Sequence, residues 1–350
     1  MKKWHTTILL IFCLMCIVNY LNAQDKFSGQ WFIGFRHHEQ EDLNQFLLKR
    51  AYISYEKQIT PWLSGRITPD ITMDREGMDK GNVELRLKYL YAQFDIPDFL
   101  FFTGNNIKTG LTPRPWIGYE QDINIYRSQG KMFLERTHVI NSTDFGIHYY
   151  SNIGNHYEQS DFETACRGTY GNMVLGVFNG GGYHALEENK NKTLEWRFTF
   201  RPFPDHFGGL LATYHGAWGH GNSVWNHTFR LNGVHLGYEH KYFVLSGQYY
   251  QGLGSYDDKL VSLVANNSIP HDGYSFFGEF RHPKTGLGAW VRYDYQNLEY
   301  TDEFAEERII VSAVWKFYNS NKIILSYDHF LEGHGDIPST LYEVTLDIRF

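Results

Sequence analysis

Apolar and polar side chains alternate, residue by residue, in many short stretches of this chain. Between Thr193 and Arg201 every second residue is apolar, and the residues between them are polar or charged. The pattern returns in 287–296 and 341–350. Because successive side chains of a β-strand point to opposite faces, each stretch predicts a strand with one apolar and one polar face. The same reading of the whole chain predicts strands near 30–37, 45–57, 61–73, 82–95, 99–111, 142–152, 168–178, 193–203, 208–218, 227–240, 242–253, 271–282, 286–299, 307–318, 321–332 and 341–350.

The connections between these strands alternate in length. Tight connections at 58–60, 96–98, 204–207, 241 and 283–285 alternate with longer ones at 74–81, 112–141, 179–192, 254–270 and 333–340, while 153–167 fits no tight turn. Short turns on one rim and long loops on the other are typical of an outer-membrane barrel, which has an even number of strands. The sequence therefore predicts an all-β protein, a transmembrane antiparallel β-barrel of about sixteen strands with short periplasmic turns and long extracellular loops. Fourteen or eighteen strands remain alternatives.

The first 23 residues read as a secretory signal. Lys2 and Lys3 precede an apolar run from Ile8 to Val18, and the small residue Ala23 follows. The run is too short to cross a bilayer, which takes about 18 or more residues, and no later stretch approaches that length. We expect a signal peptide over 1–23, cleaved near Ala23, and a single barrel domain over 24–350. A helical membrane protein is excluded.

Composition and charge exclude further classes of protein. The chain is 42% hydrophobic and 17% aromatic, which excludes a disordered or coiled-coil protein. Its formal charge is -7, and loss of Lys2 and Lys3 makes it -9, which argues against a nucleic-acid partner. Only Cys166 remains beyond the signal, so no disulfide is expected.

Alternation by itself fits a soluble β-sandwich as well as a membrane barrel. Two features favour the barrel. The chain ends on the aromatic Phe350 inside a full strand, as a barrel-closing strand does, and aromatic residues recur near strand ends, as interfacial girdles do. That second set is Trp31, Tyr55, Trp62, Tyr89, Tyr91, Tyr214, Trp218, Tyr249 and Tyr250. The alternatives are a secreted soluble β-rich protein that binds polysaccharide, and an outer-membrane barrel that conducts nothing and acts as an adhesin or scaffold.

Several segments in the first half carry a family resemblance. They are FLLKRAYISYEKQITPWLSGRITPD at 46–70, ELRLKYLYAQFDI at 84–96, FTGNNIKTGLTPRPWIGYE at 102–120, Arg127, and STDFGIHYY at 142–150. In this order they resemble the phosphate-selective porin O/P family of Gram-negative bacteria. The most specific piece is the strand that runs through Gly104 into Thr112 and Pro113.

The resemblance implies a porin of the Gram-negative outer membrane. Its expected form is a homotrimer of sixteen-stranded barrels, surrounded by lipid and lipopolysaccharide and inserted by the barrel assembly machinery. Its expected activity is passive diffusion of small hydrophilic solutes or ions, phosphate or other anions among them. A long third extracellular loop would fold inward and constrict the lumen, and 112–141 has the length and position for it.

The positions of the charged residues in the strands predict which residues line the lumen. An Arg on the lipid face at mid-membrane costs about 2–4 kcal/mol, so the charged face of each strand is expected to face the lumen. The basic wall residues are then Arg50, Arg66, Arg86, Lys88, Arg197, Arg201, Arg281, Arg292 and Arg349. The acidic ones are Glu56, Asp70, Glu84, Glu195, Glu279, Asp294, Glu343 and Asp347. This near balance predicts no strong phosphate selectivity.

The predicted constriction loop has a small surplus of positive charge. Arg114, Arg127, Lys131 and Arg136 stand against Glu120, Asp122 and Glu135. These four basic residues are the candidate constriction residues, and a mild anion preference requires Arg114 and Arg127 to project into the lumen. The alternative is that the charges only solvate the wall and latch the loop by ion pairs.

Other chemistry is not indicated. His215, His220 and His227 match no zinc-ligand spacing, and no G-x-S-x-G or metalloprotease motif is present. We therefore expect no metal, no cofactor and no enzymatic activity. Trp116, Tyr119, Tyr126 and Trp225 leave a saccharide path open as an alternative, because aromatic rings stack on sugars.

Overall fold

The structure is a computed structural model that describes residues 25–74, 80–158, 164–183, 185–262, 265–299, 304–333 and 338–350. The predicted signal peptide over 1–23 lies outside these residues and stays a prediction.

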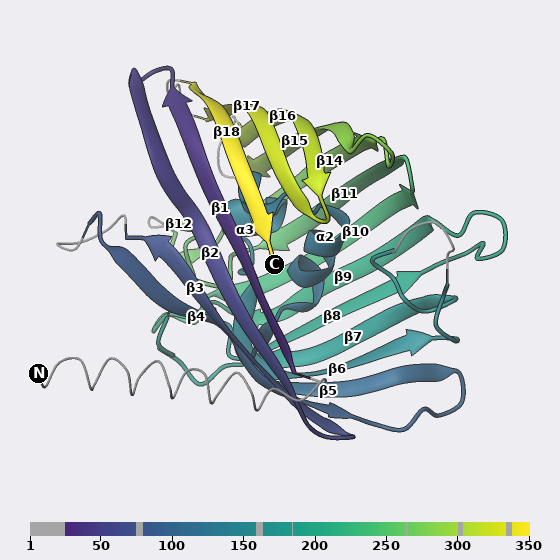
Figure 1. The fold of residues 1–350 in the computed structure, drawn as a ribbon. Helices are drawn as coiled ribbons and strands as arrows, with labels where there is room; N and C mark the ends of the chain where they lie inside the picture. The colour runs from purple at the N-terminus through teal and green to yellow at the C-terminus, as the bar shows by residue number, and fades with distance from the viewer. Residues whose placement is uncertain are drawn as a thin grey trace, which may run out of the picture.

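Sixteen strands form one closed antiparallel barrel, as the alternation predicts (Figure 1). The first eight are β1 Lys26–His38, β2 Leu43–Thr60, β3 Leu63–Met73, β4 Val83–Asp95, β5 Phe102–Pro113, β6 Thr143–Ile153, β7 Gly171–Phe178 and β8 Thr193–Phe200. The others are β9 Leu210–His220, β10 Thr228–His240, β11 Phe243–Leu253, β14 Pro270–Arg281, β15 Leu287–Leu298, β16 Phe304–Tyr318, β17 Asn321–Glu332 and β18 Ser339–Arg349. The short strands β12 Val261–Ser262 and β13 Asn267–Ser268 form a separate hairpin within the β11–β14 loop.

The first and last strands close the wall. β1 and β18 pair from Gln30 opposite Arg349 to His38 opposite Leu341. Phe350 continues the seam, since its backbone N–H and C=O both bond to Gly29, and its ring lies 5.4 Å from that of Trp31. Hydrocarbon offers no hydrogen-bond partners, so a sheet that crosses a membrane must close in this way.

The apolar face of the strands points outward. In β8 the polar residues Thr193, Glu195 and Arg197 are buried, whereas Leu194 and Phe198 are exposed. The same inversion holds in β18, where Val344 is exposed and Asp347 is buried. A soluble sandwich would bury the apolar face, so this arrangement is that of a barrel surrounded by lipid, and the soluble alternative loses its support.

The interfacial prediction is correct for some aromatic residues and wrong for others. Trp31, Trp62 and Trp218 are exposed on the outside. Tyr89 and Tyr91 instead line the interior, and Tyr250 is completely buried inside the barrel. Their position near a strand end did not distinguish the two faces.

The two rims differ as predicted, with one exception. On the rim that carries both ends of the chain, β2 and β3, β10 and β11, and β16 and β17 are joined by tight turns. The exception is the connection between β6 and β7, of which 154–158 and 164–170 are described; these two described segments are named the folded turn below. The opposite rim carries the longest connection, 114–142, named the inner loop. No helix among the described residues has the length and apolarity needed to span a bilayer.

A charge on the outer wall should destabilise the barrel according to its depth. Val311 lies in the middle of β16 and faces outward, 44% exposed. We expect Val311→Arg to lower the free energy of unfolding in lipid vesicles by about 2–4 kcal/mol. Leu287→Arg, at the first residue of β15 and also on the outer face, should lower it by about 0–1 kcal/mol. Denaturant titration measures both. Equal losses at the two positions would contradict the assignment of the outer wall to hydrocarbon.

Candidate functional site

The inner loop enters the barrel and carries three short helices, α2 Pro115–Ile123, η1 Arg127–Gln129 and α3 Phe133–Arg136 (Figure 1). Pro115 at the first helical position fixes the backbone dihedral that α2 needs to begin. The Trp116 side chain stacks flat on His215 of β9, with ring centroids 4.0 Å apart and an interplanar angle of 3°. Gly233 of β10 makes room for this pair, because a Cβ there would lie 2.3 Å from the His215 ring.

Aromatic packing continues along the loop. Tyr126 stacks on Trp290 of β15 at 5.1 Å, and Phe133 of α3 meets Tyr250 of β11 edge-on at 5.6 Å. The loop and the inner wall of β9 to β17 share one hydrophobic core. From the wall it includes Leu211, Phe229, Leu231, Val244, Tyr250, Phe277, Trp290, Ile310, Val314 and Ile324. The expectation that only polar faces turn inward is therefore wrong for this half of the barrel, because these residues have the loop rather than water to pack against.

Polar bonds complete the attachment. Arg136 pairs with Asp294 at 2.6 Å and also with Glu306, both on the wall. Glu120 of α2 accepts a hydrogen bond from Gln248 at 2.5 Å. Burial raises the pKa of Glu120 to about 7, so this carboxyl is only partly ionised near neutral pH.

Arg114 anchors the start of the inner loop to the barrel wall. Its guanidinium is completely buried and pairs with Asp144 of β6 at 2.7 Å and with Glu195 of β8 at 3.3 Å. It also donates to the backbone oxygen of Gly180 at 2.9 Å. Such buried pairs stabilise only while they are complete, because each partner alone would be an uncompensated buried charge.

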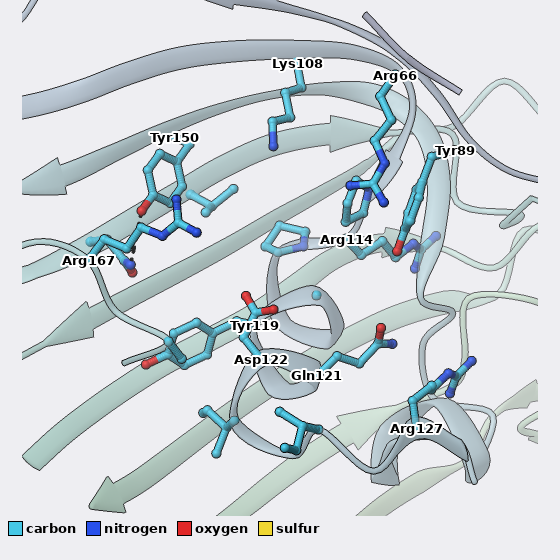
Figure 2. A pocket seen from close by; sticks show the side chains of 18 of the residues that line it. Arg66, Tyr89, Lys108, Arg114, Tyr119, Gln121, Asp122, Arg127, Tyr150 and Arg167 are labelled. Carbon is cyan, nitrogen blue, oxygen red and sulfur yellow. Dashed lines mark hydrogen bonds between the residues drawn. The ribbon is translucent and has the colours of Figure 1, made fainter. Parts of the chain in front are cut away.

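The inner loop leaves an open space on one side of the barrel. Most of the lining of this inner cavity, of about 1520 Å³, comes from α2 and the wall of β1 to β6, and a few residues of other strands, Arg197 and Arg281 among them, also reach it. Figure 2 shows Lys108 of β5 and Tyr150 of β6 facing Tyr119 and Asp122 of α2 across it. The folded turn contributes Arg167 to the same lining.

The lining is strongly basic. Among the described residues, nine cationic side chains and three carboxylates line the inner cavity. The cations are Arg66, Lys88, Lys108, Arg114, Arg127, Arg167, Arg197, Arg281 and Arg349, and the carboxylates are Asp122, Glu158 and Glu239. None of the eight predicted acidic wall residues is among them. The predicted charge balance of the wall therefore does not describe the charge that faces this space.

Seven of the thirteen basic residues predicted for the constriction or the wall come together at the inner cavity. They are Arg66, Lys88, Arg114, Arg127, Arg197, Arg281 and Arg349. The other six, Arg50, Arg86, Lys131, Arg136, Arg201 and Arg292, do not line it. Arg292 is covered by the inner loop and bonds to Asp294, and Arg201 is buried under the folded turn.

Arg127 is the constriction candidate with the clearest geometry. It reaches the cavity from η1 and binds Glu135 of α3 through both nitrogens, at 2.5 and 2.9 Å. Burial would raise the pKa of Glu135, but the charges of Arg127 and Lys88 outweigh it and hold that pKa at about 2. Lys131, between η1 and α3, is exposed.

Lys108 and Arg167 were not predicted as site residues. Lys108 sits where the alternation of β5 turns it inward, so the pattern carried a signal for it. The sequence held no such signal for Arg167, because no strand pattern gives the direction of a side chain in the folded turn.

The three histidines of 215–227 have different surroundings. His215 of β9 is buried beneath Trp116, His220 is the last residue of β9, and His227, between β9 and β10, binds Asp258 at 2.8 Å. Within the described residues no group of three or more His, Cys, Asp or Glu side chains is arranged to hold a metal ion.

Solved structures with the same fold are outer-membrane proteins. OmpTΔL8, a loop-deletion mutant of OmpT from Vibrio cholerae, is 14% identical, with a TM-score of 0.59 over 93% of this chain and 99% of that one. OmpF of Salmonella typhi, solved with daunomycin, is 13% identical, with a TM-score of 0.62 over 93% and 97%. The outer membrane channel DcaP of Acinetobacter baumannii is 10% identical, with a TM-score of 0.63 over 93% and 97%.

No family model and no curated protein matches the chain, so its resemblance to the phosphate-selective porin O/P family is not confirmed. The prediction that the chain is not an enzyme is also corrected. Its structural neighbours, OmpT among them, match at such low identity that they show the fold alone, and they give no ground for excluding catalysis. The fold itself is established: this is the closed sixteen-stranded barrel of outer-membrane porins.

Breaking the Arg114 cluster should loosen the barrel more than breaking a surface pair. Arg114→Ala leaves Asp144 and Glu195 buried without their cation, and we expect a loss of about 3–5 kcal/mol in the free energy of unfolding. The control is Lys259→Ala, which removes an exposed pair with Asp257 at 2.9 Å and should cost about 0–1 kcal/mol. Guanidinium unfolding in detergent micelles measures both. A loss for Arg114→Ala no greater than that of the control would refute the anchoring role.

Proposed function

We propose that the protein is an outer-membrane porin through which small hydrophilic solutes diffuse passively, with a preference for anions. The observation that carries this proposal is the inner cavity, a polar space inside a closed barrel in which nine cations face three carboxylates. A wall charged in this way raises the local concentration of anions and lowers that of cations. Phosphate is one anion that the resemblance to the O/P family suggests.

We propose the inner loop as the constriction of this channel. Its aromatic attachment to β9–β17 supports a fixed position, which leaves the path between α2 and β1–β6. Arg127 is the proposed constriction residue that bears most directly on selectivity, whereas Arg114 and Arg136 serve as anchors through their buried partners.

The cellular setting is part of the same proposal. We place the mature chain, cleaved near Ala23, in the outer membrane of a Gram-negative bacterium, in contact with lipid and lipopolysaccharide. The terminal Phe350 strand is the proposed signal to the barrel assembly machinery. OmpT of Vibrio cholerae has been solved in a trimer form, and a homotrimer is proposed here, to be tested by the mass of the detergent-solubilised protein.

Single-channel recording tests the function. In a planar bilayer under a KCl gradient, we expect stepwise openings and a reversal potential that indicates chloride preference. Arg127→Gln should lower the chloride-to-potassium permeability ratio by about two- to threefold, since one charge leaves the path. Lys57→Gln removes a cation that does not line the inner cavity and should leave the ratio unchanged.

Two outcomes would overturn the proposal. A barrel that inserts and shifts on heating in gel electrophoresis but never opens would favour the non-conducting adhesin or scaffold. Openings with a cation-selective reversal potential would mean that the basic lining does not border the ion path.

A further inference from the structure

The folded turn is hydrogen-bonded to residues of the barrel wall. Arg201 of the β8 end is completely buried and donates to the backbone oxygens of Gly168 at 2.5 Å and Cys166 at 2.7 Å. Its guanidinium also lies 3.7 Å from the centre of the Tyr157 ring. From β10, Glu239 accepts the backbone N–H of Ala165 at 3.0 Å. The described part of the turn is therefore held from two strands.

This anchoring sets Arg167 in the lining of the inner cavity. Tyr157 donates its backbone N–H to the Arg167 oxygen at 2.7 Å, which fixes the backbone at that residue. Figure 2 shows the Arg167 side chain beside Tyr150, at the same open space as Lys108 and Asp122. The turns on this rim of a porin are normally short. A longer turn that supplies a cation to the lumen is unusual, and this suggests a role for Arg167 in the lumen.

Lys108, Arg167 and Arg197 line the same part of the inner cavity as Asp122. Arg197 of β8 is held by hydrogen bonds to Pro115 and Asn172, at 3.0 and 2.6 Å, and lies over the ring of Tyr119 at 4.1 Å. Burial raises the pKa of Asp122, and the positive charges of Arg197, Arg167 and Lys108 oppose that rise. All four residues line the inner cavity, and Figure 2 shows Asp122, Lys108 and Arg167 at the same open space.

The cations are not neutralised by contact. Among the residues that the structure describes, no carboxylate lies within ion-pair distance of Lys108, Arg167 or Arg197. Other cations of the cavity are paired in this way, Arg127 with Glu135 and Arg349 with Asp347. The group around Asp122 therefore keeps an excess of positive charge at the inner cavity.

We infer that Lys108, Arg167 and Arg197 form a binding site for solutes that bear more than one carboxylate, with Asp122 as the built-in competitor that limits how tightly they bind. The inference rests on the proposed channel and deepens it. The site already accommodates one carboxylate, and its three cations exceed the charge of that one. Arg guanidinium groups bind carboxylates through paired hydrogen bonds, which supplies the selectivity over chloride.

The test uses citrate as the probe on the full-length mature protein in a planar bilayer. Citrate should reduce the chloride current through the unmodified channel, and Arg167→Gln should raise the half-blocking concentration about tenfold, as expected for a lost charge-assisted bond. Lys108→Gln should also raise the half-blocking concentration. This variant is independent of the first because Lys108 lies in β5 and its loss does not disturb the folded turn. Asp122→Asn should act in the opposite direction and lower the half-blocking concentration.

Matched controls lie on the same rim but away from the cavity. Lys241→Gln, in the turn between β10 and β11, and Asp205→Asn, between β8 and β9, should leave the block unchanged. If the unmodified channel conducts but citrate blocks all variants alike, the site is refuted and the channel stands. If the unmodified protein forms no channel at all, the proposed function itself fails.

Discussion

Inside this barrel, an aromatic loop rests on an apolar half of the inner wall. Trp116, Tyr126 and Phe133 pack against β9, β15 and β11, so the inner loop is held by the same burial of apolar surface that stabilises a soluble core. A barrel in lipid gains little from burying its outer face, since hydrocarbon surrounds it. Apolar surface is withdrawn from water where the inner loop packs on the inner wall. This packing determines how the rest of the lumen is arranged.

One-sided packing also separates the charges. Because the loop covers β9–β17, the carboxylates of that wall, such as Glu279 and Asp294, lie behind it and are bound by loop residues. The cations of the opposite wall, Arg66 and Lys108 among them, stay at the open space. A nearly balanced set of inward charges thus yields a cavity lined mainly by cations.

The strand pattern was readable from the sequence because lipid and lumen impose a strict period of two, as in Thr193 to Phe200, and all sixteen predicted strands are present. The inner apolar patch was not readable. Phe276 and Phe277 are neighbours on opposite faces, and only the loop determines that Phe277 has an apolar partner. Arg127 was found as a charge in a long loop, but its partner Glu135 and its position required the folded loop. Arg167 depends on a turn held by Arg201, a contact between distant parts of the chain.

The central claim is that solutes pass between α2 and β1–β6, and not along β9–β17. The most direct measurement is cysteine accessibility, because the one cysteine among the described residues, Cys166, is completely buried. A charged, thiol-reactive methanethiosulfonate should react with Gln93→Cys, on the open side, and change the conductance. The same reagent should leave Ser312→Cys untouched, since that inward position on β16 is 3% exposed. Reaction and block at Ser312→Cys, with none at Gln93→Cys, would contradict the account.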